Sequence, residues 1–213
     1  MNTATATAKA ATSTAKKSFK VQMLQVRESA IIEAVNRLLA EKGFEAMTVD
    51  EVAAEVGIAK ASLYKHFNSK EALACAAMER AMQRAQDFIE ALPAQDTPMH
   101  KLKAVTSWTM QLKLLGQMPS LPSQNSSLRA TLMASHAYMD GLMQVSEVLG
   151  GWIEQAQALG EINKQLPAVA VLYTLYARAC DPVLEFLKMG NNLTDAEVLD
   201  MVMCSCFEGL QAR

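Results

Sequence analysis

Residues 60–70, KASLYKHFNSK, hold a high density of side chains that donate hydrogen bonds. Ammonium groups, hydroxyls and an imidazole can bind phosphate oxygens or base edges, and a small alanine lets a helix approach a thymine methyl group. This chemistry is typical of a surface that contacts a nucleic acid. The side chains expected on that surface are Lys60, Ala61, Ser62, Tyr64, Lys65 and His66.

A helix that enters a groove needs a second helix behind it and a tight turn between the two. The helix contact requires a small residue, the turn a residue that tolerates positive φ, and the second helix an apolar anchor. Ala53, Gly57 and Leu63 stand at those offsets. The spacing predicts a helix-turn-helix whose second helix runs from Lys60 to Phe67.

Local signals also define the neighbouring helices. Thr48 precedes Glu51 by three residues, which forms a capping box for the short helix that ends at the turn. Apolar residues at three- and four-residue spacing predict an earlier helix that closes at Gly43. Ser69 caps a later helix that ends before Pro93.

Residues 29–75 resemble the DNA-binding part of the tetracycline-repressor (TetR) family of bacterial transcription regulators, above all in the run AEKGFEAMTVDEVAAEVGIAKASLYKHFNSKEAL. The resemblance covers roughly a quarter of the chain. Ala61 departs from the family, in which glycine is commoner there. The matching positions are Phe44, Thr48, Ala53, Gly57, Lys60, Leu63, Tyr64, Phe67, Ser69, Lys70 and Glu71.

The resemblance implies that the second helix of the motif enters the major groove, and it divides the contacts into two sets. Contacts with the DNA backbone phosphates are expected from Thr48, Tyr64, His66 and Lys70. The residues expected to lie nearer the bases are Lys60, Ala61, Ser62 and Lys65. Lys70 has independent support, because it starts a helix whose unpaired N–H groups attract anions. Two alternatives stay open: Tyr64 can cover the motif's own core, and His66 can be an ordinary surface histidine.

Composition predicts an all-α protein. Apolar residues make up 51% of the 213 residues and charged residues 20%, and residues that favour helix dominate. The longest apolar run, residues 166–177, is shorter than the about 18 residues of a membrane span, and the N-terminus has no apolar leader. The four cysteines lack framework spacing, so we expect reduced thiols and a cytoplasmic protein.

Charge and motif placement divide the chain into three segments. Residues 1–75 carry 10 basic and 8 acidic residues, whereas the rest carries 10 basic and 14 acidic. We expect a basic, flexible tail over residues 1–24, which either stays solvated or grips DNA as an arm. A DNA-binding head over residues 25–73 and a helical ligand-binding and dimerisation body over residues 74–213 follow it.

Longer helices are expected in the body. The pattern predicts helices over 101–115, over 128–159 with a break at Gly141 or at Gly150 and Gly151, and over 167–188 with a kink at Pro182. A final helix over 194–210 opens with a Thr-x-x-Glu capping box. The last two helices are apolar nearly all round, so each must be covered on two sides by other helices that exclude water, one set from its own protomer and a second set from elsewhere. Homodimerisation through about 167–188 and 194–210 supplies the second, as the resemblance also implies.

Methionines and aromatic residues gather between the head and the dimerisation helices. Methionine adapts to varied shapes, and aromatic rings with polar groups suit a small, largely apolar ligand. An ordinary core is the alternative to a ligand site. The candidate ligand-binding residues are Trp108, Met133, His136, Met139, Trp152, Tyr173 and Tyr176.

Other functional classes find less support in the sequence. The three histidines lack metal-ligand spacing, and no nucleophile elbow or glycine-rich phosphate loop occurs, so we expect no catalytic site, metal or cofactor. The expected function is a sequence-specific regulator of transcription, most often a repressor in this family, released from a pseudo-palindromic operator by the ligand. The alternatives are a cysteine-based redox sensor and an interaction protein of the same fold without an operator.

Overall fold

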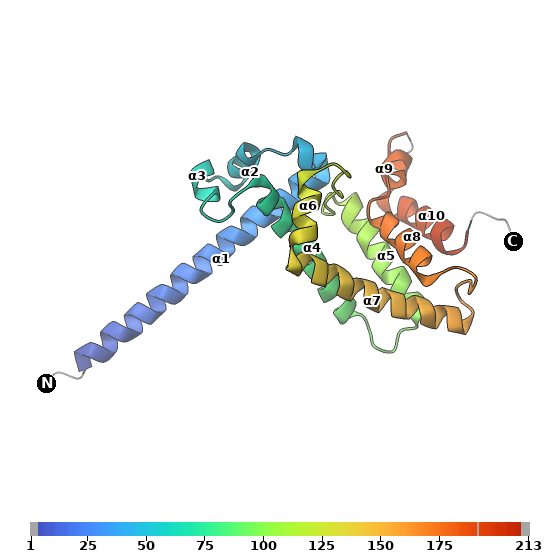
Figure 1. The fold of residues 1–213 in the computed structure, drawn as a ribbon, viewed down its shortest axis with the longest axis horizontal. Coiled ribbons are helices and arrows are strands. Elements are labelled where there is room, and N and C mark those ends of the chain that lie inside the picture. The colour runs from blue at the N-terminus through green and yellow to red at the C-terminus, as the bar shows by residue number, and fades with distance from the viewer. Residues whose placement is uncertain (1–3, 191, 210–213) are drawn as a thin grey trace.

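The computed structural model describes the backbone of residues 4–190 and 192–209, with side chains from residue 21 onward in those ranges. The described residues form helices, turns and loops without a strand, so the all-α prediction is confirmed (Figure 1). The helices are α1 (Ala4–Ala46), α2 (Val49–Val56), α3 (Lys60–Leu63), α4 (Lys70–Ala91), α5 (Pro98–Leu114), α6 (Ser127–Ala134), α7 (His136–Leu159), α8 (Ala168–Ala179), α9 (Val183–Lys188) and α10 (Asp195–Phe207).

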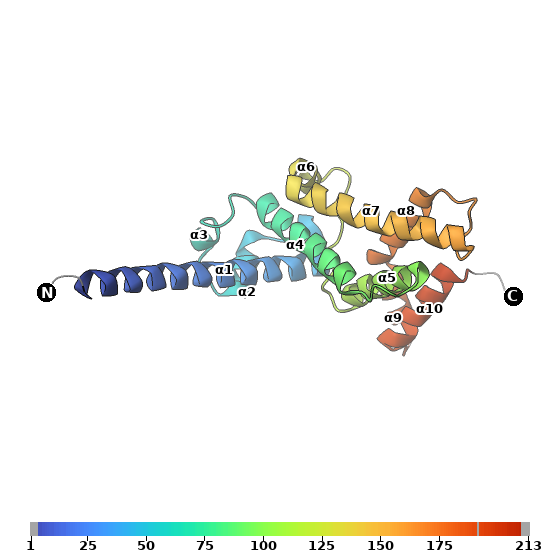
Figure 2. The same cartoon turned by 90° about the horizontal axis from the view of Figure 1, so that it is seen from below.

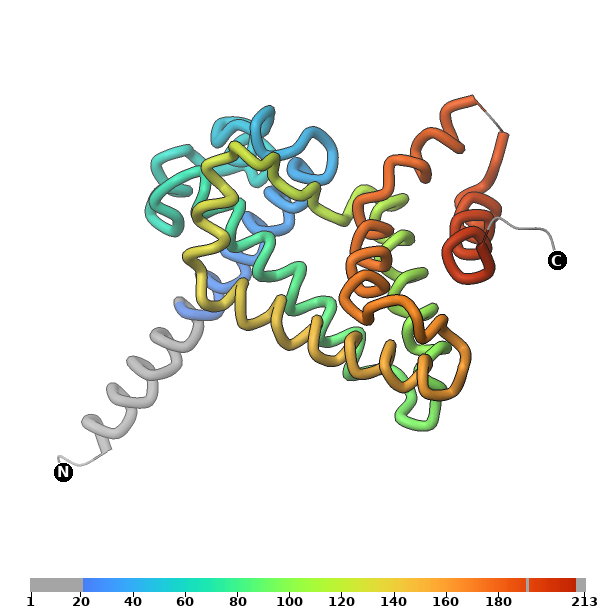
Figure 3. The backbone as a smooth tube through the Cα atoms, turned by 45° about the vertical axis from the view of Figure 1, so that its right-hand side comes forward, coloured from blue at the N-terminus to red at the C-terminus, as the bar shows by residue number. Residues whose placement is uncertain are grey.

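Three apolar clusters hold these helices together. The first joins α1, α2, α3 and the start of α4, and it also takes in residues of α6 and α7. The second lies among the end of α4, α5, α7 and α8, and the third among α5, α9 and α10. The head and the α8–α10 end therefore lie on opposite sides of the molecule (Figure 3).

Helix α4 connects the head with the body. Its 22 residues span about 33 Å at 1.5 Å per residue. Leu73 and Met78 are buried in the first cluster, whereas Phe88 and Ile89 pack against the second. Helix α7 runs beside α4 and changes cluster in the same way: Tyr138 belongs to the first cluster, and Val145 and Leu149 belong to the second (Figure 2).

One predicted break in the body lies elsewhere than expected, and another is more complete than the predicted kink. The helix over 128–159 breaks at Ser135, and α7 continues through Gly141, Gly150 and Gly151. Ser135 is extended, with φ −80° and ψ 114°, and its hydroxyl accepts the Tyr138 N–H and caps α7. The predicted kink at Pro182 is a complete break between α8 and α9, because proline lacks the N–H that would continue the helix.

Element ends in the rest of the chain also differ from the sequence prediction. Helix α1 begins at Ala4 and continues through the expected boundary at residue 24, consistent with an alanine-rich composition; residues 1–3 lie outside the described part. Helix α3 ends at Leu63 and a turn completes the predicted segment to Phe67. None of the described helices combines the length and apolar content that a membrane crossing requires.

Candidate nucleic-acid interface

The helix-turn-helix forms through the local contacts that its sequence predicts. The Thr48 hydroxyl accepts the Glu51 N–H at 3.2 Å, and the Glu51 carboxylate accepts the Thr48 N–H at 2.9 Å, which completes the capping box of α2. Gly57 adopts the left-handed conformation, with φ 71° and ψ 35°. The Ile58 N–H then donates to the Ala53 carbonyl at 3.0 Å, so the turn is closed by the small residue and glycine that predicted it.

The buried and exposed sides of α3 separate as expected. Leu63 is fully buried and Phe67 is buried, and both belong to the first cluster. Tyr64 is 44% exposed, which is more than a residue that only covers the core requires. The other candidates on this segment are exposed (Lys60, Ala61 and Lys65) or half-buried (Ser62 and His66). The fold leaves all six available on the surface of the head.

Three cations of the head are paired with acids of α2. The Lys60 ammonium lies 2.9 Å from the Asp50 carboxylate, whose hydrogen bond raises the pKa of Lys60. Lys42 pairs with Glu51 at 2.7 Å, and this hydrogen bond is the first cause that holds the pKa of Glu51 at about 2. The third pair is Arg37 with Glu55. Within the described residues no ion pair involves Lys65, which makes it the less constrained of the two lysines of this segment.

Asp50 is the residue that the sequence analysis missed at this surface. It stands ten residues before Lys60, on the other side of the turn, so no helical spacing links the two. Both side chains are largely exposed, so the pair contributes little to stability. Its effect is to restrain the lysine at the start of α3, where base contacts are expected.

Lys70 joins α4 to the end of α1. Its ammonium donates to the Glu45 carbonyl at 3.2 Å and lies 4.4 Å from the centre of the Phe44 ring. The adjacent Glu71 carboxyl has a lowered pKa, first because its own backbone N–H donates to it and then because of the Ser127 hydroxyl. The start of α4 therefore already holds one anion, and Ser69 caps it as predicted, by accepting the Ala72 N–H.

The candidate ligand residues fall into two groups. Trp108 stacks on Phe88 with ring centres 4.6 Å apart, and Trp152 packs against the second cluster. Tyr176 belongs to the same region and its hydroxyl lies 2.7 Å from that of Ser146. Tyr173 is exposed, but its ring meets the Tyr176 ring edge-on with ring centres 6.4 Å apart. The other three candidates lie elsewhere: Met139 packs on the first cluster, and Met133 and His136 are exposed.

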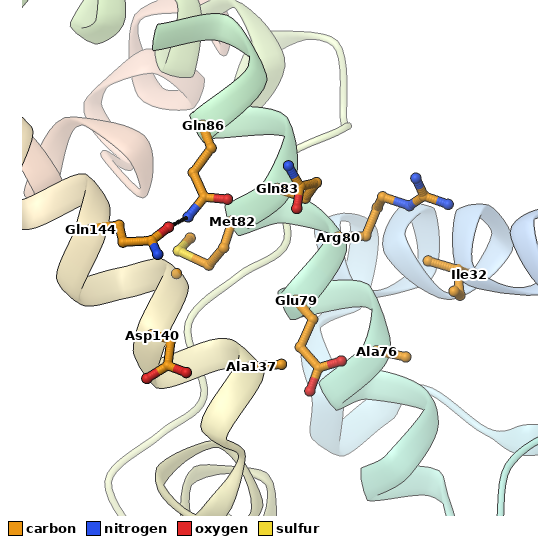
Figure 4. A pocket seen from close by; sticks show the side chains of 11 residues that line it. Ile32, Ala76, Glu79, Arg80, Met82, Gln83, Gln86, Ala137, Asp140 and Gln144 are labelled. Atoms are coloured by element: carbon orange, nitrogen blue, oxygen red, sulfur yellow. Dashed lines mark hydrogen bonds between the residues drawn. The ribbon is translucent and has the colours of Figure 1, made fainter. Parts of the chain in front are cut away.

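A groove of about 370 Å³ lies elsewhere, between α1, α4 and α7 (Figure 4). Its lining combines charged and amide side chains, including Glu79 and Asp140, with apolar residues such as Ile32 and Met82. A hydrogen bond of 2.6 Å from Gln86 to Gln144 crosses it from α4 to α7. None of the seven candidate ligand residues lines this groove.

The cysteines and acids show little sign of reactive chemistry. Burial raises the pKa of the Cys75 thiol to about 11, and it raises the pKa of Cys180 and Cys206 as well. A thiol with a raised pKa forms little of the nucleophilic thiolate. Among the described residues, no three histidine, cysteine, aspartate or glutamate side chains are grouped so that they could hold a metal ion.

Comparison with known proteins identifies the same segment. The family model described as bacterial regulatory proteins of the tetR family matches residues 31–77. An uncharacterized HTH-type transcriptional regulator of Bacillus subtilis, YdeS, is 28% identical over 86% of this chain and 89% of its own length. A second regulator of that organism, YerO, is 49% identical over 53 residues, which are 25% of this chain and 18% of YerO.

Solved structures extend the likeness to the whole fold. The regulator FadR of Bacillus subtilis in complex with stearoyl-CoA has a TM-score of 0.62 at 20% identity, covering 86% of this chain and 99% of its own. AibR in complex with isovaleryl coenzyme A and operator DNA has a TM-score of 0.60 at 19% identity, with 85% and 98% covered. Residues 31–77 therefore match the helix-turn-helix domain of the TetR family, and the whole chain has the fold of these solved regulators.

Proposed function

We propose that the chain is a homodimeric repressor that binds a pseudo-palindromic operator and leaves it when a small, largely apolar ligand binds to the body. The observation that carries the DNA-binding surface is the fixed geometry of the turn: Gly57 and buried Leu63 hold α3 so that its polar side faces outward. A protein of this kind acts in the cytoplasm, where the operator is, and needs no catalytic site.

The contacts proposed with DNA are those expected from the sequence. Lys65 is the strongest candidate for a base edge, because it is exposed and bears no acid partner among the described residues, while Lys60 must first leave Asp50. Tyr64 and Lys70 are proposed phosphate contacts. Thr48 and His66 join them, with Ala61 and Ser62 nearer the bases.

The dimer is proposed to form through α8, α9 and α10. Leu172 and Val202 are buried inside the protomer, which gives α8 and α10 an inner side. Their outer sides, with α9, are apolar and exposed, as expected of a surface that a second copy covers. This outer set is Val169, Tyr173, Val183, Phe186, Met189 and Met201. A two-fold dimer would present two α3 segments about 34 to 36 Å apart, one per half-site.

The ligand is proposed to bind beside Trp108, Trp152 and Tyr176. Trp152 and Tyr176 pack on the second cluster, and Trp108 stacks on Phe88 of α4, which packs on the same cluster. Two neighbours of the same fold are complexes with stearoyl-CoA and isovaleryl coenzyme A, which makes acyl thioesters of coenzyme A the first class to test. A coupling of about 1 to 3 kcal/mol through α4 would weaken operator binding 5- to 150-fold.

Selection of bound sequences from a random pool of double-stranded DNA tests the proposal. A dyad-symmetric consensus is expected, with binding that weakens steeply as salt rises because each phosphate contact releases counterions. The selected operator is then titrated with protein in the presence of acyl thioesters of increasing chain length. The absence of any enriched sequence would favour the interaction protein without an operator.

The redox alternative receives little support from the thiols. Three of the four have pKa values raised by burial, which leaves little of the reactive thiolate, and exposed Cys204 donates to the Glu208 carboxylate at 3.7 Å. Peroxide should therefore leave operator affinity unchanged. If peroxide abolishes operator binding by the wild type but not by a variant in which a cysteine is replaced by serine, the redox alternative is restored.

A further inference from the structure

Side-chain hydrogen bonds join helix α6 to α4 at both ends of α6. The Ser127 hydroxyl donates to the Glu71 carboxylate at 2.8 Å, and the Ser135 hydroxyl donates to the Glu79 carboxylate at 2.6 Å. The two serines are separated by the same number of residues as the two glutamates, a rise of about 12 Å along either helix. The two helices therefore lie side by side, in the same direction, over equal lengths.

Apolar packing fills the space between these two hydrogen bonds. Leu128 and Leu132 of α6 are buried in the first cluster, which also contains Leu73 and Met78 of α4. No described residue of α6 belongs to the second or third cluster. Although the sequence assigns α6 to the body, its packing joins it to the head (Figure 1).

We infer that Ser127 and Ser135 are positioning residues for DNA binding. Through their hydrogen bonds to Glu71 and Glu79, the two serines hold α6 against the first turns of α4. These two hydrogen bonds fix the orientation in which the start of α4 meets the operator. The inference rests on the proposed function, in which Lys70 contacts a phosphate. Because these hydrogen bonds order α4 before the operator binds, binding costs less conformational entropy. Loss of either hydrogen bond therefore weakens operator affinity.

Ser127 also controls where one acidic group lies. Glu71 is the second residue of α4, beside Lys70, and the Ser127 hydroxyl ties its carboxylate toward α6. Without that hydroxyl the carboxylate keeps the hydrogen bond from its own backbone N–H but loses the one that draws it toward α6, and a carboxylate that turns toward the DNA would repel a phosphate. Both effects of the Ser127→Ala change act in the same direction.

The test compares operator affinity among full-length variants, with the operator taken from the selection above. Ser127→Ala is the cleaner probe, because Ser135 also caps α7. We expect Ser127→Ala to weaken binding about fivefold or more with the same consensus and salt slope, a size typical of coupling energies. Ser127→Thr, which keeps the hydroxyl, should restore affinity, and amide exchange in α6 should be faster in the alanine variant alone.

Thr97→Ala is the matched control for a general loss of stability. Thr97 caps α5, in the body, by accepting the His100 N–H, and it has no part in the proposed interface. This variant should bind the operator as the wild type does. Equal affinity of Ser127→Ala and wild type, or equal weakening in Thr97→Ala, would overturn the inference alone. A wild type that binds no DNA would overturn the proposed function and the inference with it.

Discussion

Replacing Gly141 with alanine tests how closely α4 and α7 approach where both helices pass from the first cluster to the second. A Cβ at this position would lie 3.1 Å from the Cβ of Met82. That atom is attached to the α4 backbone, and the hydrogen bond between Gln86 and Gln144 holds the two helices together nearby. The clash therefore cannot be relieved by rotation of a flexible side-chain end.

Two opposing effects determine how much Gly141→Ala changes the free energy of unfolding. Alanine in a helix interior is favoured over glycine by about 0.8 to 1 kcal/mol. Overpacking of a tight contact costs about 1 to 3 kcal/mol. Gly141→Ala should therefore leave the free energy of unfolding between about unchanged and about 2 kcal/mol lower.

Gly150→Ala supplies the matched control in the same helix. No atom lies within 4 Å of a Cβ at Gly150, so only the helix preference operates, and this variant should be more stable than the wild type by about 0.5 to 1 kcal/mol. Urea unfolding followed by circular dichroism measures both variants. If Gly141→Ala stabilises as much as Gly150→Ala, the close approach of α4 and α7 is refuted.

Further predictions concern the head. Leu63→Ala empties a fully buried site and should lower the free energy of unfolding by about 2 to 5 kcal/mol in urea titrations; a loss under 1 kcal/mol would contradict the packing of α3. Because the folded pKa of Glu51 is about 2 against its usual 4.5, the stability it contributes beside Lys42 is present above pH 4.5 and is lost as pH falls toward 2. Wild type and Glu51→Gln should therefore converge in unfolding midpoint at the acid end, and a constant gap would argue against this. Lys65→Ala should change base preference at one operator position by about 1 to 3 kcal/mol, whereas Lys70→Ala should weaken all sequences alike; measured affinities for single-base operator variants separate the two, and uniform weakening in both would remove Lys65 from the bases.

The sequence by itself determined the helix-turn-helix and the surface it presents. The Thr48 capping box, the Gly57 turn and the Ser69 cap each depend on contacts within a few residues along the chain, so residue type and spacing suffice to place them. The apolar spacing around Leu63 likewise identified the buried side of α3 and left the polar side outward. The DNA contacts assigned to that side remain predictions.

Only the tertiary structure decided which distant side chains meet. The Ser135 hydroxyl, at the break between α6 and α7, donates to Glu79, 56 residues earlier, and the restraint on Lys60 depends on an acid across the turn. Composition also grouped seven ligand candidates that the fold separates into a half-buried aromatic group and exposed residues such as Met133. Helical periodicity specifies a face, but which neighbour covers that face depends on packing over long chain separations, and no local pattern encodes it.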